Sequence, residues 1–280
     1  MPPSRHSVSD SRPTPPHPRE GAAAAQRHKT QAIGQRLRLA VLLAACAVCG
    51  PSWAGEITVS AAASLREAFT ALVPLFQAAH PGTTVRLNTA ASGVLLQQIQ
   101  RGAPVDVFAS ADTETMDRAQ PLLQAGSRHD FATTALVVVV PIAPGAPALQ
   151  SLADLTNPAV TRVAVGVPAS VPAGRYARQA LQQAGLWAAV EPKVVGVQNV
   201  RQALDYAARA EVDAAFVYAT DAALKPDRVR VALQVPGVTV RYPIAVLAAS
   251  ADPAAAQRFV DYVRSKPAQG VLMRFGFTVP

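Results

Sequence analysis

Strand-like and helix-like segments alternate along the chain from residue 57 to residue 275. Short apolar runs rich in β-branched residues are typical of strands, and most are followed by apolar residues spaced three and four apart, which marks one helical face. Strands that alternate with helices in this way form βαβ units, so the pattern predicts an α/β fold with largely parallel sheets. The run Ala135–Val140 contains no polar residue and predicts a fully buried strand.

The same patterns give approximate bounds for the elements. Strands are predicted at Ile57–Ser60, Val85–Asn88, Val105–Ala109, Ala135–Val140, Arg162–Gly166, Lys193–Gly196, Ala214–Tyr218, Val229–Leu233 and Val240–Ala248. Helices are predicted from Leu65 to Phe76, around Leu95–Ile99, after Asp112, and at Arg175–Ala184, Val200–Ala210, Pro253–Ser265 and Gln269–Phe275. No internal repeat and no long linker interrupts this series.

Residues 1–54 form a separate region that predicts export. A basic stretch at Arg36–Arg38 precedes an apolar run, Leu39–Cys49, and the small-residue end Ser52–Ala54. This order is typical of a secretory signal cleaved after Ala54, so we expect a periplasmic protein whose mature form begins near Gly55. The run is too short for a permanent membrane span. A lipoprotein signal that leaves Cys46 as a lipidated first residue is the alternative.

Charge and reactive side chains exclude several functions for the rest of the chain. The formal net charge is +8, but residues 1–54 hold seven Lys and Arg against two acidic residues, which leaves 19 against 16 beyond them. That balance does not resemble a nucleic-acid surface. Both cysteines precede residue 54, only His80 and His129 follow it, and no nucleophile elbow, P-loop or zinc motif is present. We therefore expect neither an enzyme nor a bound cofactor.

Four segments place small or hydroxyl residues where a helix is predicted to begin after a strand. They are Ala62–Leu65, Ala91–Val94, Val171–Gly174 and Gln198–Arg201. The first backbone N–H groups of a helix have no intrahelical acceptor and lie at the positive end of its dipole, which makes such positions anion sites in open α/β sheets. The four segments together predict an anion site at the carboxyl ends of the strands.

Each of these segments also has a purely structural interpretation. Ser64 and Glu67 fit a capping box, and Asn199 with Gln202 fits a similar cap. Ser92 with Gly93 fits a turn and cap, and Pro172 suits the first position of a helix. Asp106 and Asp112 could be paired carboxylates, although a strand-end residue and a helix N-cap are the simpler interpretation.

The chain resembles the periplasmic molybdate-binding components of ABC transporters, a family of type II solute-binding proteins. The blocks that carry the resemblance run in the family's order from Glu56 to Val279: ITVSAAASLREAF, GAPVDVFASAD, LVVVVP, VPAGRYARQAL, VRQAL, FVYATDA and RFGFTV. The family often has an acidic residue where this chain has Val167. That departure puts hinge or supporting hydrogen bonds in doubt, and the ligand contacts are not affected.

The resemblance implies a two-lobed periplasmic-binding-protein fold with an oxyanion in the cleft. Lobe one would comprise residues 56–136 and 243–280, and lobe two residues 137–242. The ligand-binding residues carried over by motif are Ser64, Ser92, Ala173, Val200 and Tyr218. They would contact the metal oxyanion through its oxygens, without direct metal ligands. The family also implies a monomer that captures molybdate or tungstate for the membrane permease of an ABC importer.

None of the five positions is charged, so binding would depend on hydrogen-bond donors alone. Phosphate keeps a proton near neutral pH and needs an acceptor that such a site lacks, whereas molybdate, tungstate and sulfate do not. A receptor for sulfate or another small tetrahedral oxyanion is therefore the alternative function. A ligand-sensing domain of a regulator is less consistent with the export signal.

Overall fold

The computed structural model describes residues 55–279, so the predicted signal region and Cys46 lie outside the described residues. Within this range the strands form one eight-stranded sheet with the order β2-β1-β3-β8-β4-β7-β5-β6. The strands are β1 (Gly55–Ala62), β2 (Thr83–Ala90), β3 (Val107–Ala109), β4 (His129–Pro141), β5 (Val163–Gly166), β6 (Val194–Val197), β7 (Ala214–Tyr218) and β8 (Val229–Val246).

The helices connect and cover these strands. The α-helices are α2 (Arg66–Ala79), α3 (Ser92–Gln100), α4 (Thr113–Ala119), α5 (Pro172–Gln183), α6 (Trp187–Val190), α7 (Val200–Ala208), α8 (Ala219–Ala222), α9 (Pro253–Val263) and α10 (Lys266–Arg274). Short 3-10 turns occur at η1 (Ala63–Leu65), η2 (Gln120–Leu122), η3 (Leu152–Thr156) and η4 (Glu191–Lys193). No helix among residues 55–279 has the length and apolar character needed to cross a membrane.

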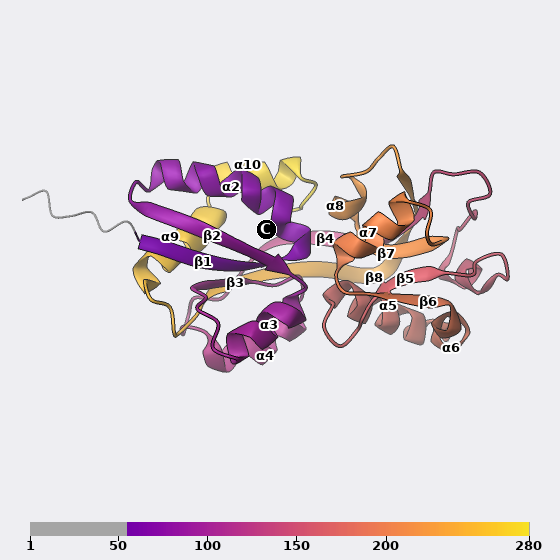
Figure 1. Cartoon of the computed structure of the whole chain (residues 1–280), viewed down its shortest axis with the longest axis horizontal. Coiled ribbons are helices and arrows are strands. Elements are labelled where there is room, and N and C mark those ends of the chain that lie inside the picture. Colours follow the sequence, from indigo (N-terminus) through magenta and orange to yellow (C-terminus); the bar gives the residue numbers. More distant parts are fainter. Residues whose placement is uncertain (1–54, 280) are drawn as a thin grey trace, which may run out of the picture. The chain divides into compact units, whose positions relative to one another are not determined.

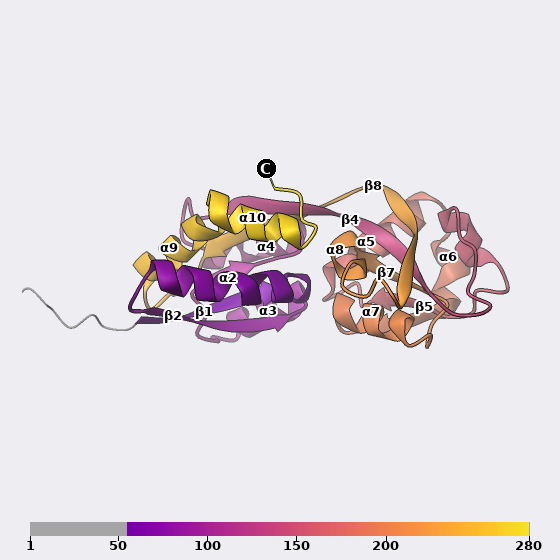
Figure 2. The ribbon, with the colours of Figure 1, turned by 90° about the horizontal axis from the view of Figure 1, so that it is seen from above.

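The elements fall into two lobes joined by two long strands (Figure 1). The first lobe contains β1, β2, β3, α2, α3, α4, α9 and α10, and the second contains β5, β6, β7, α5, α6, α7 and α8. Strands β4 and β8 run through both lobes side by side (Figure 2). The end of β8 pairs with β3, whereas the end of β4 pairs with β7. The predicted lobe boundaries, after residues 136 and 242, fall inside these two strands and stay a prediction.

The α/β class is confirmed, but the sheet is mixed rather than largely parallel. Each lobe has parallel pairs, β1 with β2 and β3 in the first and β5 with β6 and β7 in the second. The pairs that involve β4 or β8 are antiparallel. The prediction of two separate strands at Val229–Leu233 and Val240–Ala248 was wrong, because β8 is continuous from Val229 to Val246. Pro236 and Gly237 interrupt the apolar pattern, yet the chain stays beside β4 with irregular register.

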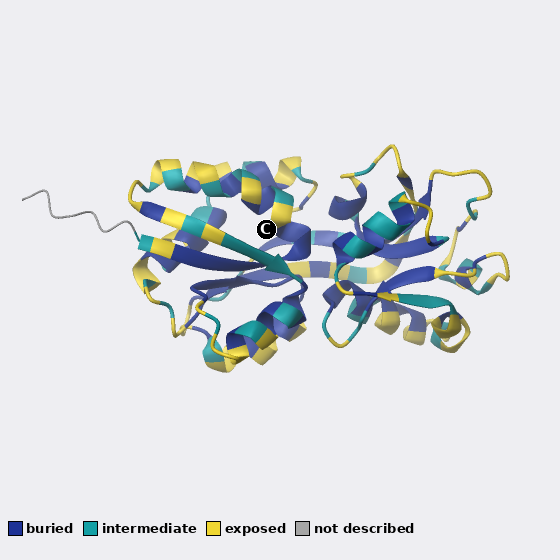
Figure 3. Ribbon diagram, in the orientation of Figure 1, coloured by how far each residue is buried: buried dark blue, intermediate teal, exposed yellow. Residues whose placement is uncertain are grey.

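Burial follows the sequence pattern closely. Residues 136–140 of β4 are at most 3% exposed, as a run without polar residues predicts. On α2, Phe69, Leu72 and Phe76 share one face and are fully buried, and Phe69 and Phe76 pack against the ring of Phe259 on α9. Figure 3 shows β1, β3, β5 and β7 mostly buried, whereas the edge strands β2 and β6 are largely intermediate or exposed. The sheet in each lobe is therefore a rigid base for the segments that follow its strands.

Candidate functional site

One small pocket lies between the lobes at the carboxyl ends of the parallel strands. The first lobe contributes the segments that follow β1, β2 and β3, and the second contributes the start of α5, the start of α7 and the end of β7. This is the position at which open α/β sheets bind ligands. The lining residues are Ala62, Ala63, Ser64, Ala91, Ser92, Ala111, Val171, Pro172, Ala173, Val200 and Tyr218.

The pocket is small and carries no formal charge of its own. The space between its lining atoms is about 200 Å³, which includes its opening to solvent. This is below the roughly 300–1,000 Å³ of pockets that bind drug-sized molecules, so the pocket suits a small ligand. Apart from the phenol of Tyr218, no lining residue has an ionisable side chain.

The structure brings all five sequence-predicted residues together in this pocket. Ser64 lies in the 3-10 turn η1, Ser92 is the first residue of α3, and Tyr218 is the last residue of β7. Ala173 and Val200 occupy the second position of α5 and the first position of α7. Val167, the departure from the family pattern, does not line the pocket, and its side chain packs at the edge of the core.

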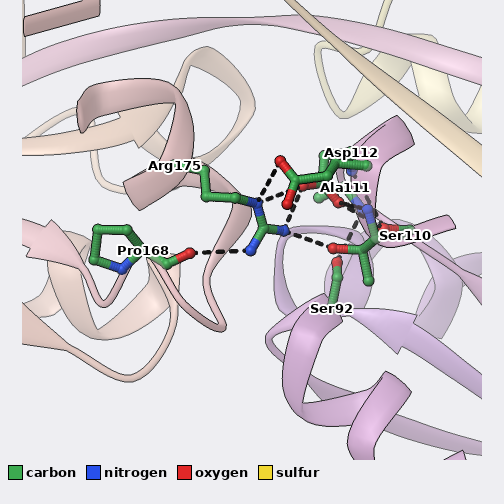
Figure 4. Close-up of polar contacts among 8 residues, drawn as sticks. Ser92, Ser110, Ala111, Asp112, Pro168 and Arg175 are labelled. Atoms are coloured by element: carbon green, nitrogen blue, oxygen red, sulfur yellow. Dashed lines mark hydrogen bonds and ion pairs between the residues drawn. The ribbon is translucent and has the colours of Figure 1, made fainter. Parts of the chain in front are cut away.

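The two serine hydroxyls are buried and each has one neighbour in the protein. Ser92 Oγ accepts a hydrogen bond of 3.0 Å from the backbone N–H of Ala111 (Figure 4). Ser64 Oγ lies 3.1 Å from the phenolic oxygen of Tyr242 on β8. A hydroxyl that accepts one bond still has its own hydrogen to donate. Ser92 can therefore donate into the pocket.

Tyr218 places a hydroxyl in the pocket without any partner among the described residues. Its side chain is 1% exposed, and Tyr218 Oη is a buried atom that makes no hydrogen bond there. Burial, and secondly the neighbouring Tyr242, raise the pKa of Tyr218 well above its ordinary value, so the phenol keeps its proton. An unpaired buried hydroxyl costs about 1–3 kcal/mol, a cost that a ligand oxygen would offset.

Two backbone N–H groups in the second lobe complete the set of donors. Ala173 and Val200 lie in the first turns of α5 and α7, where N–H groups have no intrahelical acceptor. The start of α5 lies very close to β5: a Cβ added to Gly174 would lie 1.8 Å from the carbonyl oxygen of Gly166. Only glycine permits this approach, which fixes the position of the Ala173 amide.

Several local interpretations of the sequence can now be checked. Asn199 caps α7 by accepting from Gln202 N–H, Asp112 caps α4, and Pro172 opens α5, as predicted. The prediction of a capping box formed by Ser64 and Glu67 was wrong. Ser64 makes no capping hydrogen bond, because it lies inside η1 and Leu65 occupies the N-cap position of α2, and Glu67 pairs instead with Arg201.

Arg201 crosses from the second lobe to the segment that holds Ser64. Its guanidinium donates to the carbonyl oxygens of Ala63 at 3.2 Å and Ser64 at 3.0 Å, and it pairs with Glu67. Its fourth neighbour is Asp221, with Nη1 and Oδ1 3.0 Å apart but not aligned for a hydrogen bond. Burial raises the pKa of Asp221 to about 6, although Arg201 opposes the shift.

Arg175 crosses between the lobes on the other side of the pocket (Figure 4). Its side chain, 15% exposed, pairs with Asp112 of the first lobe and donates to the carbonyl oxygen of Pro168 at 3.0 Å. A third contact joins the lobes directly, since Gly93 N–H donates to Ser170 O at 3.0 Å. The sequence analysis missed both arginines, because a single arginine in an amphipathic helix is most often a surface residue.

Comparisons with known proteins agree with this arrangement. Residues 57–278 match the family model described as bacterial extracellular solute-binding protein. Over 239 residues the chain is 36% identical to the molybdate-binding protein ModA of Escherichia coli, an alignment that covers 80% of this chain and 90% of that protein.

Two solved structures have the same fold. A substrate-binding domain from Clostridium difficile, described as part of a molybdenum ABC transporter, is 30% identical with a TM-score of 0.61, covering 80% of this chain and 98% of that one. The periplasmic molybdate-binding protein of Azotobacter vinelandii is 24% identical with a TM-score of 0.67, covering 80% and 100%. At that lower identity the likeness shows the fold alone. These relatives are substrate-binding components of transport systems.

Proposed function

The chain belongs to the bacterial extracellular solute-binding protein family, and from this premise we propose that it captures molybdate, together with tungstate, for an ABC importer. The observation that carries the proposal is the composition of the pocket. Residues that carry three hydroxyls and two helix-start amides line one small space that has no charged lining residue. The names of the E. coli and C. difficile relatives, a molybdate-binding protein and a domain of a molybdenum ABC transporter, support molybdate as the ligand.

Neutral donors can bind a dianion because they replace its water without bringing in a countercharge. A hydrogen bond to a charged group contributes roughly 1.5–3 kcal/mol net, so five such bonds support tight binding after the cost of ordering. The helix dipoles of α5 and α7 add partial positive charge at the same point. The oxyanion's own oxygens make the contacts, so Ser64, Ser92, Ala173, Val200 and Tyr218 bind the metal only indirectly.

The transport role follows from the family and from closure of the lobes. The lobes bury the ligand between them, and the closed form is the state that a membrane permease would recognise. We propose that the chain acts as a monomer in the periplasm, with residues 56–136 and 243–280 as lobe one and 137–242 as lobe two. We propose that it binds no cofactor and catalyses no reaction, because the pocket lining offers no general base that could activate its serine hydroxyls.

A panel of oxyanions tests the proposal. Melting of the purified protein should shift strongly with millimolar molybdate or tungstate, because a ligand that binds only the folded state stabilises it by about 4 kcal/mol at a thousandfold excess over Kd. Sulfate should shift the melting temperature little and phosphate hardly at all. A sulfate shift equal to that of molybdate would favour the alternative receptor, and an equal phosphate shift would contradict a pocket made of donors only.

A further inference from the structure

Tyr242 lies behind the pocket and outside its lining, yet it contacts one of the lining hydroxyls. Its side chain is fully buried, and its phenolic oxygen lies 3.1 Å from Ser64 Oγ. The rings of Phe131, Tyr218 and Phe277 surround it in edge-to-face contacts. Ser64 Oγ is the single hydrogen-bond partner that the structure gives the Tyr242 hydroxyl among residues 55–279.

The direction of this hydrogen bond follows from the surroundings. If Ser64 donated to Tyr242, the phenolic hydrogen would remain buried among aromatic rings without an acceptor, and an unmet donor is expensive. If Tyr242 donates, its only hydrogen is used and the oxygen of Ser64 becomes the acceptor. The hydrogen of Ser64 is then left for another partner, and the open direction is the pocket.

We propose that Tyr242 is a positioning residue that holds the Ser64 hydroxyl as a donor to the ligand and thereby excludes oxyanions that retain a proton. The inference rests on the proposed oxyanion function of the pocket. A protonated oxyanion needs one acceptor, and the two serine oxygens are the aliphatic hydroxyl acceptors of the pocket lining. The phenolic oxygen of Tyr218 also belongs to the lining, but its lone pairs are conjugated with the ring, which makes it a weaker acceptor. Tyr242 occupies the oxygen of Ser64, and the Ala111 N–H occupies that of Ser92. The carbonyl oxygens of Ala63 and Ser64 are taken by Arg201.

Both serine oxygens thus accept a hydrogen bond from the protein, but from different kinds of donor. Ser92 is held by a backbone N–H, which no side-chain substitution removes. Ser64 is held by a side chain from β8, 178 positions away in sequence, and the substitution Tyr242→Phe removes only the phenolic oxygen. This substitution frees one acceptor at the pocket wall and leaves the aromatic packing in place.

The test compares competition by sulfate and by hydrogen phosphate, two tetrahedral anions of similar size that differ in a proton. Each is titrated against bound molybdate at pH 7.5 in the wild-type protein and in Tyr242→Phe. We expect hydrogen phosphate to compete about tenfold better in Tyr242→Phe, because Ser64 can now accept its proton, while sulfate competes no better than in the wild type. Molybdate itself should bind about three- to tenfold more weakly, since Ser64 is no longer aligned.

Two control variants separate positioning from a general loss of packing. Tyr218→Phe removes a phenol from the same pocket, and Ser64→Ala removes the hydroxyl itself; neither adds an acceptor, so phosphate competition should not improve in either. Melting without ligand verifies that all three variants fold. If a folded Tyr242→Phe variant shows unchanged competition by hydrogen phosphate, the inference is wrong. The proposed function still stands in that case if the wild-type protein binds molybdate. A wild-type protein that does not bind molybdate overturns the proposed function instead.

Discussion

The two lobes contribute different kinds of groups to the pocket. The first lobe offers two serine hydroxyls, Ser64 and Ser92, whereas the second offers two backbone amides, at Ala173 and Val200, and the phenol of Tyr218. The direction of a helix-start N–H group is set by the axis of its helix, and close packing such as that of Gly174 against Gly166 holds the group in place. A hydroxyl rotates and takes the direction that its neighbours leave open. The second lobe therefore provides two fixed amides and one phenol, and the first provides two serine hydroxyls whose direction the surrounding protein determines.

The two lobes also contribute different charged side chains to the interface between them. Arg175 and Arg201 extend from the second lobe, and their partners Asp112 and Glu67 lie on the first. Each arginine is within two positions of a residue whose amide faces the pocket, Ala173 or Val200. The ion pairs and the anion pocket therefore lie at neighbouring positions between the lobes, and the pairs can stabilise this arrangement without touching the ligand.

The largest effect is expected where the backbones of the two lobes meet. A Cβ on Gly93 would lie 2.6 Å from Ser170 O, a backbone atom that cannot move aside without shifting the start of α5. Gly93→Ala should weaken molybdate binding about a hundredfold by opposing closure, as measured by calorimetry. Gly270→Ala on α10, with no atom within 4 Å of the new Cβ, is the matched control. Equal affinities in the two variants would show that closure does not need this contact.

The next effect is expected from the one hydroxyl that the second lobe contributes to the pocket. Tyr218→Phe should weaken molybdate binding by about 1–3 kcal/mol, because one charge-assisted donor is lost and no protein group replaces it. The apo protein should be at least as stable as the wild type, since the lost hydroxyl has no partner among the described residues. Calorimetry gives the affinity and urea unfolding the stability. An unchanged affinity would make Tyr218 a core residue only.

A smaller effect is expected from the ion pair beside α5. Arg175→Gln should speed molybdate release about tenfold by weakening the closed form, with little change in association rate. Asp112→Asn is a suitable partner variant because asparagine still caps α4. In a stopped-flow double-mutant cycle the two substitutions should not be additive. Additive effects would show that the pair does not contribute to closure.

The smallest effect is expected from pH. Burial raises the pKa of both Tyr218 and Tyr242 well above 10, so both phenols remain protonated donors and molybdate affinity should change less than twofold between pH 7 and 9. The raised pKa values also affect the free energy of unfolding. The buried, protonated phenols contribute stability below the pKa of an unfolded tyrosine, near 10, and this contribution is lost as the pH rises above that value. A marked loss of affinity by pH 9 would show that a pocket phenol ionises early.

Much of the fold could be predicted because its signals are local. The apolar run of β4, the caps at Asp112 and Asn199 and the proline that opens α5 act within a few residues of where they stand. The continuity of β8 through Pro236 could not be predicted, because β4 alone keeps that segment extended. Residues of the pocket were predicted from helix starts and from the family resemblance together.

The sequence by itself determined which groups stand at the ends of the strands, since strand, turn and helix start are properties of neighbouring residues. Only the tertiary structure decided how those groups are used. Arg175 meets Asp112 across 63 positions, Arg201 meets Glu67 across 134, and Tyr242 meets Ser64 across 178. Whether the Ser64 hydroxyl donates or accepts depends on a side chain that no local pattern connects to it, because the direction of a hydroxyl hydrogen is set by its neighbours in space.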